Sequence, residues 1–304
     1  MQNLLNKDLG EFTIGWFLLS VIVGGIFGAA IKYLFEVRLP QSVKRKQRIE
    51  EKVRKYSYPL LQAASDVELR IYNILNEGAK KDWLKSSVID DLDQGGGFLK
   101  DPNKGMGYFF LSTVYVFAGY FAWVEILKRE AGFLDFPRGE ESTDFYDILH
   151  RVNNAFRSTD LWKLNDGKQK SRDCTLLRRH IQSAIGEIMI IERNKVLDCI
   201  SFREFVDKYT DSGNDRFRFW LRNLTSYFED LSDLDITDMD QVLSEKGEFR
   251  ILRLIAIRYW YFKLIQFLDP RFEKVQYRDG LYEQKILEPL AEPYRSAVVN
   301  LPTD

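Results

Sequence analysis

Hydrophobic positions recur with the period of an α-helix along most of the chain. Apolar residues follow one another at steps of three and four in segments at about 60–75, 106–130, 142–157, 172–209, 215–231 and 248–268, with a shorter one at 283–291. Such steps place side chains on one face of a helix, whereas strands alternate at every second residue. Since strand-like alternation is nearly absent, the sequence predicts an all-α fold.

Capping and breaking residues predict where these helices begin and end. Pro59 should interrupt a charged helix that begins near residue 43, because proline removes a backbone donor. Ser142 should cap one helix and Pro270 should end another. The segment 172–209 is typical of one long helix, and the glycines between residues 78 and 107 predict a long loop.

An uncharged run near the N-terminus predicts a transmembrane helix. Residues 12–31 contain no charged side chain, and at about 1.5 Å per residue they cover the roughly 30 Å of a bilayer core. Trp16 and Tyr33 lie near its two ends, where aromatic residues anchor spans at the interface. A cleaved signal peptide would have a basic start and a shorter apolar run. Residues 1–37 are therefore predicted to be a tail and a retained anchor.

Basic residues after the span predict its orientation. Residues 38–58 are expected to form a juxtamembrane helix with a clear excess of Lys and Arg, which the N-terminal tail lacks. The positive-inside rule then places this helix and residues 59–304, a multi-helix bundle, in the cytoplasm, with the N-terminus outside. Contacts with anionic lipid headgroups are expected from Lys44, Arg45, Lys46 and Arg48.

Small residues within the span predict self-association. Ser20, Gly24 and Gly28 recur every four residues, a spacing that lets two helix backbones approach closely. A homodimer through the anchor is therefore an expected partnership, in addition to the lipid bilayer. A lone spanning helix also tolerates glycine, so the spacing leaves both arrangements open.

A second uncharged run, residues 106–124, is also long enough to cross a bilayer. Its Tyr108, Tyr115 and Gly119 share one helical stripe, which fits packing against other helices with the tyrosine hydroxyls bonded. The flanking charges show no asymmetry that would orient a span. We therefore expect a buried helix of the cytoplasmic domain, and a second span, as in a pore, is the alternative.

Composition and charge exclude some classes of function. Lys and Arg total 44 and Asp and Glu total 45, so the net charge of -1 gives no support to nucleic-acid binding. Cys174 and Cys199 lie far apart on one predicted helix, which favours two free thiols in a reducing compartment over a disulfide. With 45% hydrophobic residues, the chain can bury a substantial core.

No cluster of residues has the specificity of a catalytic, metal or cofactor site. His180 and Glu187 are weak catalytic candidates, because they share one side of a helix but lie two turns apart, too far for a direct hydrogen bond. The histidines and cysteines lack the spacing of a zinc site, and the acidic loop after residue 90 lacks the last ligand of a calcium loop. No glycine-rich loop ends in Gly-Lys-Ser/Thr. We expect no cofactor and no metal.

Arginines carry the remaining candidate chemistry. The candidates are Arg178, Arg179, Arg250, Arg253 and Arg258. These arginines could bind phosphate, or they could form ion pairs with the equally numerous carboxylates. A pocket in which Arg178 meets Glu125 or Glu187 would favour a ligand-binding or enzymatic role. A pocket around Arg250 would favour the same role.

Two stretches of the chain resemble an uncharacterised family of bacterial proteins. These stretches are Tyr120–Glu130, with the sequence YFAWVEILKRE, and Ile181–Ile190, with the sequence IQSAIGEIMI. The resemblance covers a small part of the chain. It implies a bacterial source and a membrane-anchored helical protein, and it implies no activity.

These observations together predict a single-pass protein of the inner membrane whose cytoplasmic domain is an interaction, sensing or scaffolding module of unknown pathway. Two alternatives remain open from the sequence. One is a membrane-anchored enzyme or ligand-gated effector with an arginine–carboxylate site. The other is a multi-span or pore-forming protein that uses residues 106–124 as a second span.

Overall fold

The computed structural model describes residues 39–76, 84, 106–131, 140–163, 177–232, 249–275, 283–292 and 294–302. The predicted span, with Ser20, Gly24 and Gly28, lies outside the described residues. The residues predicted to contact lipid are Lys44, Arg45, Lys46 and Arg48. Their backbone is part of a described helix, but their side chains lie outside the description. The chain divides into two compact units, Met1–Lys52 and Val53–Asp304, and the features below belong to the second unit.

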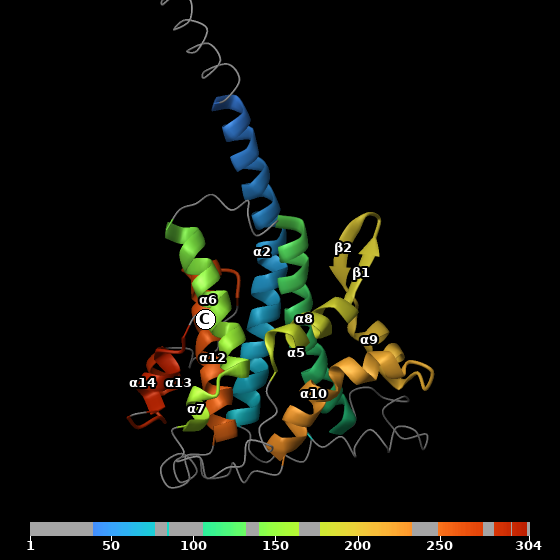
Figure 1. Cartoon of the computed structure of the whole chain (residues 1–304), viewed down its shortest axis with the longest axis vertical. Coiled ribbons are helices and arrows are strands. Elements are labelled where there is room, and N and C mark those ends of the chain that lie inside the picture. The colour runs from blue at the N-terminus through green and yellow to red at the C-terminus, as the bar shows by residue number, and fades with distance from the viewer. Residues whose placement is uncertain are drawn as a thin grey trace, which may run out of the picture. The chain divides into compact units, whose positions relative to one another are not determined.

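The described residues are mostly helical, which confirms the all-α part of the predicted fold class (Figure 1). The helices are α2 (Leu39–Asn76), α5 (Met106–Ala131), α6 (Glu140–Arg157), α7 (Asp160–Lys163), α8 (Arg179–Ile188), α9 (Phe202–Thr210), α10 (Asp215–Ser232), α12 (Phe249–Leu268), α13 (Glu283–Leu287) and α14 (Tyr294–Val299). Two short antiparallel strands, β1 (Ile190–Arg193) and β2 (Val196–Cys199), form a hairpin between α8 and α9.

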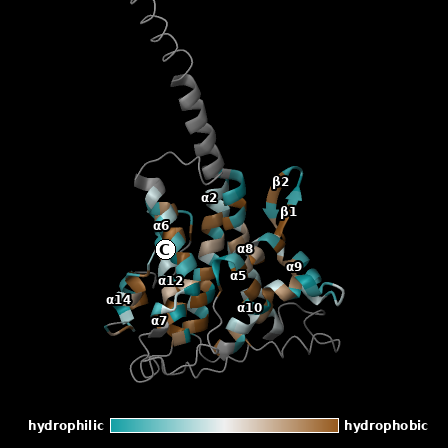
Figure 2. Cartoon of the chain, in the orientation of Figure 1, coloured by the Kyte–Doolittle hydropathy of each residue, from teal (hydrophilic) through white to brown (hydrophobic). Residues whose placement is uncertain are grey.

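Two helices, α5 and α12, form the centre of the core. Every residue from Ile251 to Phe262 is buried, so α12 is covered around its whole circumference. It packs against α6, α7, α13 and α14, whereas α5 packs against α8, α9, α10 and β2. Hydrophobic residues, brown in Figure 2, recur along α12, while α9 and the hairpin carry hydrophilic residues in teal. A helix that is apolar on all sides is stable in water only when other elements surround it.

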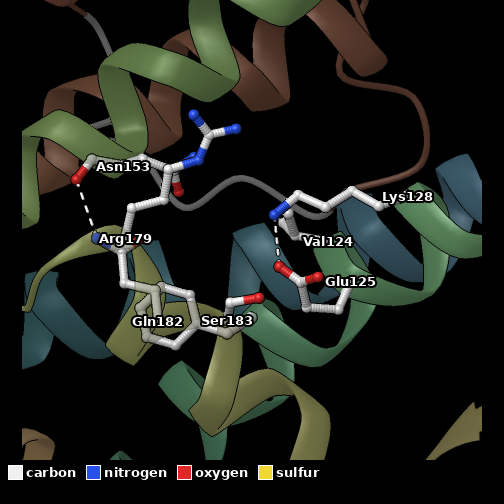
Figure 3. A pocket seen from close by; sticks show the side chains of 8 residues that line it. Val124, Glu125, Lys128, Asn153, Arg179, Gln182 and Ser183 are labelled. Carbon is white, nitrogen blue, oxygen red and sulfur yellow. Dashed lines mark hydrogen bonds and ion pairs between the residues drawn. The ribbon is translucent and has the colours of Figure 1, made fainter. Parts of the chain in front are cut away.

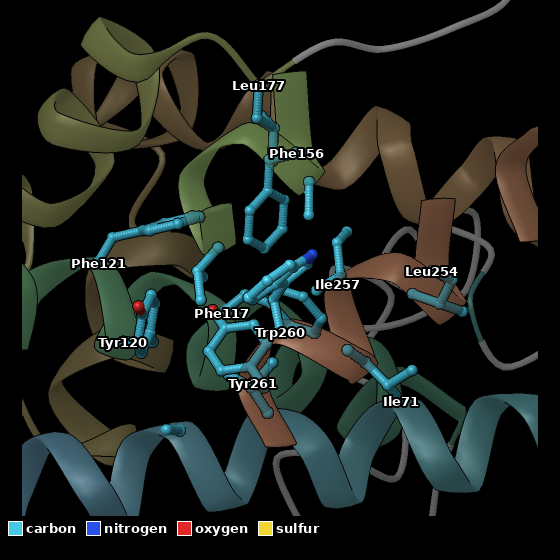
Figure 4. Close-up of a cluster of buried hydrophobic side chains, with 14 of the residues drawn as sticks. Ile71, Phe117, Tyr120, Phe121, Phe156, Leu177, Leu254, Ile257, Trp260 and Tyr261 are labelled. Atoms are coloured by element: carbon cyan, nitrogen blue, oxygen red, sulfur yellow. The ribbon is translucent and has the colours of Figure 1, made fainter. Parts of the chain in front are cut away.

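Aromatic side chains join these helices at the middle of the core. Phe156 of α6 lies edge-on to Phe121 of α5, with ring centroids 5.2 Å apart (Figure 4). Tyr120 of α5 and Tyr261 of α12 make a similar contact at 4.6 Å. Aromatic pairs favour such edge-to-face geometry because the positive ring edge meets the negative ring face. The contacts fix α5, α6 and α12 against one another.

Helix α5 combines the length of a membrane span with the burial of a core helix. Within the described residues it is the only helix long and apolar enough to cross a bilayer, and 83% of its most apolar window is buried inside the fold. The Tyr115 hydroxyl donates to the Ile200 carbonyl at 3.0 Å, and Tyr108 packs edge-on against Phe202. The stripe predicted to pack against other elements therefore does so, with the Tyr115 hydroxyl bonded.

Helix α2 continues through Pro59, so the predicted interruption there is wrong. An internal proline costs roughly 3 kcal/mol because it removes one hydrogen bond and crowds the preceding turn. Leu60 and Leu61 follow it and are almost fully buried. Burial of a leucine side chain contributes about 1.5–3 kcal/mol, so packing of these two leucines offsets the cost of the proline.

The predicted helix over 172–209 is also wrong, because a hairpin interrupts it after Ile188. Asn194 and Lys195 form the two-residue turn with φ of 53° and 63°. Positive φ at both positions matches the right-handed twist of hairpin strands, but Lys at the second position lacks the usual glycine signal. Helix α9 then begins at a capping box in which Ser201 and Glu204 bond each other's backbone N–H. Cys199 consequently lies on a strand.

Other predicted boundaries have mixed outcomes. Helices α5, α10 and α12 match their predicted ranges, and α12 ends before Asp269-Pro270 as expected. Ser142 lies inside α6, which begins at Glu140, so its predicted role as an N-cap is wrong. The predicted helix at 283–291 ends at Leu287, and the further helix α14 follows Pro293.

Candidate functional site

A small polar pocket opens where α5, α6 and α8 meet (Figure 3). Its space, partly open to solvent, is about 200 Å³. The lining side chains come from three helices and are Phe121, Val124, Glu125 and Lys128 of α5, Asn153 of α6, and Arg179, Gln182 and Ser183 of α8. Most of these side chains are polar, although the surrounding helices are rich in apolar residues.

Gly186 sets the close approach of α8 to α5. A Cβ atom at this position would lie 2.5 Å from the Phe121 carbonyl oxygen and 2.9 Å from Cγ of Glu125. Real Cβ atoms do not come so close to backbone oxygen, so only glycine fits without a shift of one helix. The close packing places one turn of α8, with Gln182 and Ser183, beside the α5 turn that carries Glu125.

Gln182 forms the buried floor of the pocket. The residue is only 4% exposed, and its Nε2 donates to the carbonyls of Leu177 at 2.7 Å and Asn153 at 3.1 Å. Since both partners are acceptors, the amide atom that faces them is the nitrogen Nε2, and the oxygen Oε1 points away from them. Among the described residues Oε1 has no hydrogen-bond partner. A buried acceptor of this kind normally binds an ordered water or a ligand donor, because leaving it unbonded costs about 1–3 kcal/mol.

Basic groups dominate the mouth of the pocket. Lys128 forms an ion pair with Glu125, whereas the exposed Arg179 guanidinium makes no hydrogen bond or ion pair with the described residues. Helix α8 also begins without a side-chain cap and without an acidic residue in its first turn. A helix N-terminus carries a partial positive charge, so an arginine there is unfavourable by itself and favourable beside a bound anion.

The pKa of His150 reports the same positive surroundings. Burial is the main cause that lowers this pKa, and the charge of Arg179 is the next. Arg157 and Lys128 lower it further, and Asp147 opposes them. His150 lies one helical turn before Asn153 on α6. Three cations thus act on one imidazole near the pocket, which marks this region of the surface as a place where an anion would be stabilised.

The predicted catalytic candidates lie elsewhere on α8. His180 and Glu187 are exposed, and neither lines the pocket. Glu187 instead forms an ion pair with Arg129 at 3.1 Å. Ser183, which lies between them on α8, does line the pocket. The structure therefore does not bring the imidazole and this carboxylate together.

Four of the five arginines predicted to bind phosphate fall into two groups, and the fifth, Arg250, is half-buried on α12 and does not line the pocket. Arg253 and Arg258 are buried in the core and bonded to protein groups, so they hold the fold together. Arg178 and Arg179 are exposed at the start of α8, and only Arg179 lines the pocket. The expected meeting of Arg178 with Glu125 or Glu187 is not seen among the described residues: Arg179, not Arg178, lines the pocket with Glu125, and the ion pairs of Glu125 and Glu187 are with Lys128 and Arg129.

Sequence reasoning missed Lys128, Asn153 and Gln182. Each is a polar residue one turn from apolar positions, and none belongs to a recognisable motif. A polar glutamine within the apolar stripe of α8 was the available signal, because a polar residue on a buried face needs a partner. Within the part of the chain that the structure describes, no group of three or more His, Cys, Asp or Glu residues could hold a metal ion.

Comparisons with known protein families, curated proteins and solved structures gave no match to this chain. The resemblance of Tyr120–Glu130 and Ile181–Ile190 to a bacterial family therefore stands without support from a family match. The functional argument rests on the site itself.

Proposed function

We propose that this protein is a membrane-tethered sensing module that binds a small anion in the pocket between α5, α6 and α8. The tether is the uncharged run at 12–31, followed by a basic flank that favours a cytoplasmic location for the rest of the chain. Anionic headgroups next to Lys44, Arg45, Lys46 and Arg48, and a second anchor packed on Ser20, Gly24 and Gly28, are the partners that this arrangement favours.

One observation carries the ligand proposal: unpaired polar groups of α8 line a small pocket that residues of α5 and α6 also line. The Arg179 guanidinium and the Ser183 hydroxyl have no partner among the described residues, and the buried Oε1 of Gln182, in the same pocket lining, has no donor. A phosphate or carboxylate could accept from the guanidinium, and a hydroxyl or amine of the same ligand, or a bridging water, could donate to Gln182. The pocket itself has room for about one water molecule, so the anionic group would bind at the mouth.

The burial of α5 supports a single span over the multi-span alternative. Its apolar side chains contact α8, α9 and α10, so lipid contact would require these elements to separate. A reporter fused after Asp304 should therefore be active in the cytoplasm. Activity outside the membrane would overturn the proposed orientation and favour a second span.

Binding is tested by calorimetric titration of the detergent-solubilised full chain with inorganic phosphate. Replacing Arg179→Ala should weaken phosphate binding about tenfold, since a hydrogen bond to a charged group contributes about 1.5–3 kcal/mol. The matched control is Arg178→Ala, which removes the same charge from the same helix end but does not line the pocket. Equal affinity of the two variants, or no binding by the wild type, would remove the anion proposal.

A further inference from the structure

Two tyrosine hydroxyls lie in the centre of the core without a protein partner. Tyr120 of α5 and Tyr261 of α12 are each 0% exposed, and their rings lie next to each other in the aromatic cluster (Figure 4). Among the described residues, neither hydroxyl oxygen has a hydrogen-bond partner. Buried tyrosine hydroxyls are usually bonded, because an unbonded one loses its bonds to water and gains none. Two such groups side by side therefore indicate a polar site inside the apolar core.

The two hydroxyls do not bond each other. Their ring planes stand at 75° with the centroids 4.6 Å apart, and no O–H···O bond joins the two oxygens. Burial raises the pKa of both hydroxyls, and the nearby Tyr120 raises the pKa of Tyr261 further. Both groups are therefore protonated at neutral pH, so each can donate one hydrogen bond and also accept through its lone pairs.

Their surroundings differ from those of a third tyrosine on α5. The Tyr115 hydroxyl donates to the Ile200 carbonyl at 3.0 Å, so the fold itself supplies its acceptor. The buried pair instead contacts Phe121 and Phe156, whose side chains are hydrocarbon. Carbonyls in the interior of α5 and α12 accept bonds within their own helices. What fits two hydroxyls in such surroundings is a small molecule that both donates and accepts.

We infer that the hydroxyls of Tyr120 and Tyr261 bind one internal water molecule, which joins α5 to α12. Water is the smallest molecule that can accept a hydrogen bond from one hydroxyl and donate one to the other. Two such bonds of about 2.8 Å connect oxygens that lie up to about 5.6 Å apart. Phe121 is 2% and Phe156 is 1% exposed, so a larger ligand would have to displace closely packed rings.

Thermal melting of the full chain in detergent tests the site through the sign of two substitutions. Tyr120→Phe or Tyr261→Phe alone takes one partner from the water and should lower the melting midpoint by roughly 2–4 °C. The double variant leaves no hydroxyl at the site and should recover most of that loss. Hydroxyls that lacked any partner would give the opposite sign, because each substitution would then remove an unbonded group. A midpoint that either single substitution raises or leaves unchanged would overturn the water site.

Two further variants calibrate the melting experiment. Tyr58→Phe changes a tyrosine that is 55% exposed and should leave the midpoint within about 1 °C of the wild type, as is usual at the surface. Tyr115→Phe removes a hydroxyl that is bonded to the protein, so it gives the loss expected when a buried bond on α5 is broken.

A crystal structure of the full chain separates a water bridge from a direct bond between the two hydroxyls, which would give the same melting result. An ordered water within about 3.2 Å of both oxygens supports the site. A direct contact of about 2.8 Å between the oxygens of Tyr120 and Tyr261, or the lack of an ordered water between them, would overturn it.

Discussion

Two arginines of α12, Arg253 and Arg258, and the two arginines at the start of α8 occupy opposite environments in one fold. Arg258 is 7% exposed, and its Nε donates to Glu68 of α2 at 2.7 Å. Arg253 is 1% exposed and donates to the Ser158 carbonyl at 2.8 Å, close to the end of α6. Arg178 and Arg179, by contrast, lie exposed at the start of α8, and their guanidinium groups make no hydrogen bond or ion pair with the described residues.

Under the proposed function, this difference separates the cations that stabilise the fold from those that bind the ligand. A buried cation is tolerated only when carbonyls or carboxylates satisfy it, so its partners are part of the fold. An exposed cation beside a helix N-terminus gains nothing from the fold and stays solvated, so it is available to an anion from outside. Residue type alone did not distinguish the two groups. The following predictions test this distinction by substituting members of both groups.

The largest effect is expected at Arg258. Arg258→Met leaves the Glu68 carboxylate buried beside an apolar side chain, and loss of one partner of a buried pair costs about 3–5 kcal/mol. Burial raises the pKa of Glu68 and Arg258 opposes that rise, so removing the arginine should raise this pKa further. Thermal unfolding of the full chain gives the stability change. The double variant Glu68→Leu with Arg258→Met is the control and should recover most of the loss, because no buried charge is left.

A smaller loss is expected at Arg253. Arg253→Met keeps most of the side-chain volume beside Phe249 but leaves the Ser158 carbonyl without its charged donor. Loss of a hydrogen bond to a charged group should lower stability by about 1.5–3 kcal/mol. The same melting experiment measures it. A change as small as that of an exposed arginine would show that Arg253 contributes no more to the fold than a surface cation.

The free energy of unfolding should change little when Arg179, at the start of α8, is replaced. Arg179→Ala is expected to alter the free energy of unfolding by less than about 0.5 kcal/mol, as is usual for surface substitutions. Relief of repulsion with the helix N-terminus acts in the stabilising direction. Thermal melts without added anion test this, and addition of phosphate should raise the midpoint of the wild type more than that of the variant. A large destabilisation without anion would place Arg179 among the structural arginines.

The smallest effect is the pH dependence of anion affinity. The pKa of His150 is lowered by burial and by Arg179, Arg157 and Lys128, so the imidazole is neutral at pH 7 and gains charge as the pH falls through this lowered value. A bound anion favours the charged form, and affinity should therefore rise on acidification. One added positive charge on His150, separated from the bound anion by solvent, implies about a twofold gain in affinity. Sulfate, whose charge is constant in this range, is the calorimetric probe, and His150→Gln should abolish the gain.

Helical period and breaking residues in the sequence determined the fold class and the extents of the central helices. The long apolar windows of α5 and α12, and the Asp269-Pro270 stop, were sufficient because helix formation depends on spacing within one segment. The same local rules failed at Pro59, where burial of Leu60 and Leu61 outweighs a lost hydrogen bond. They failed again at Asn194 and Lys195, where a turn forms without glycine.

Only the tertiary structure decided which polar residues meet. Glu125, Asn153 and Gln182 are far apart in sequence and on separate helices, and they converge because Gly186 lets α8 approach the backbone of α5. The Tyr120 and Tyr261 rings likewise meet only in the folded core, because they come from α5 and α12. The spacing of residues within a segment determines each helix and its apolar face. Which helices pack against one another depends on how their whole surfaces fit, because a densely packed core is formed by one arrangement of many contacts at once.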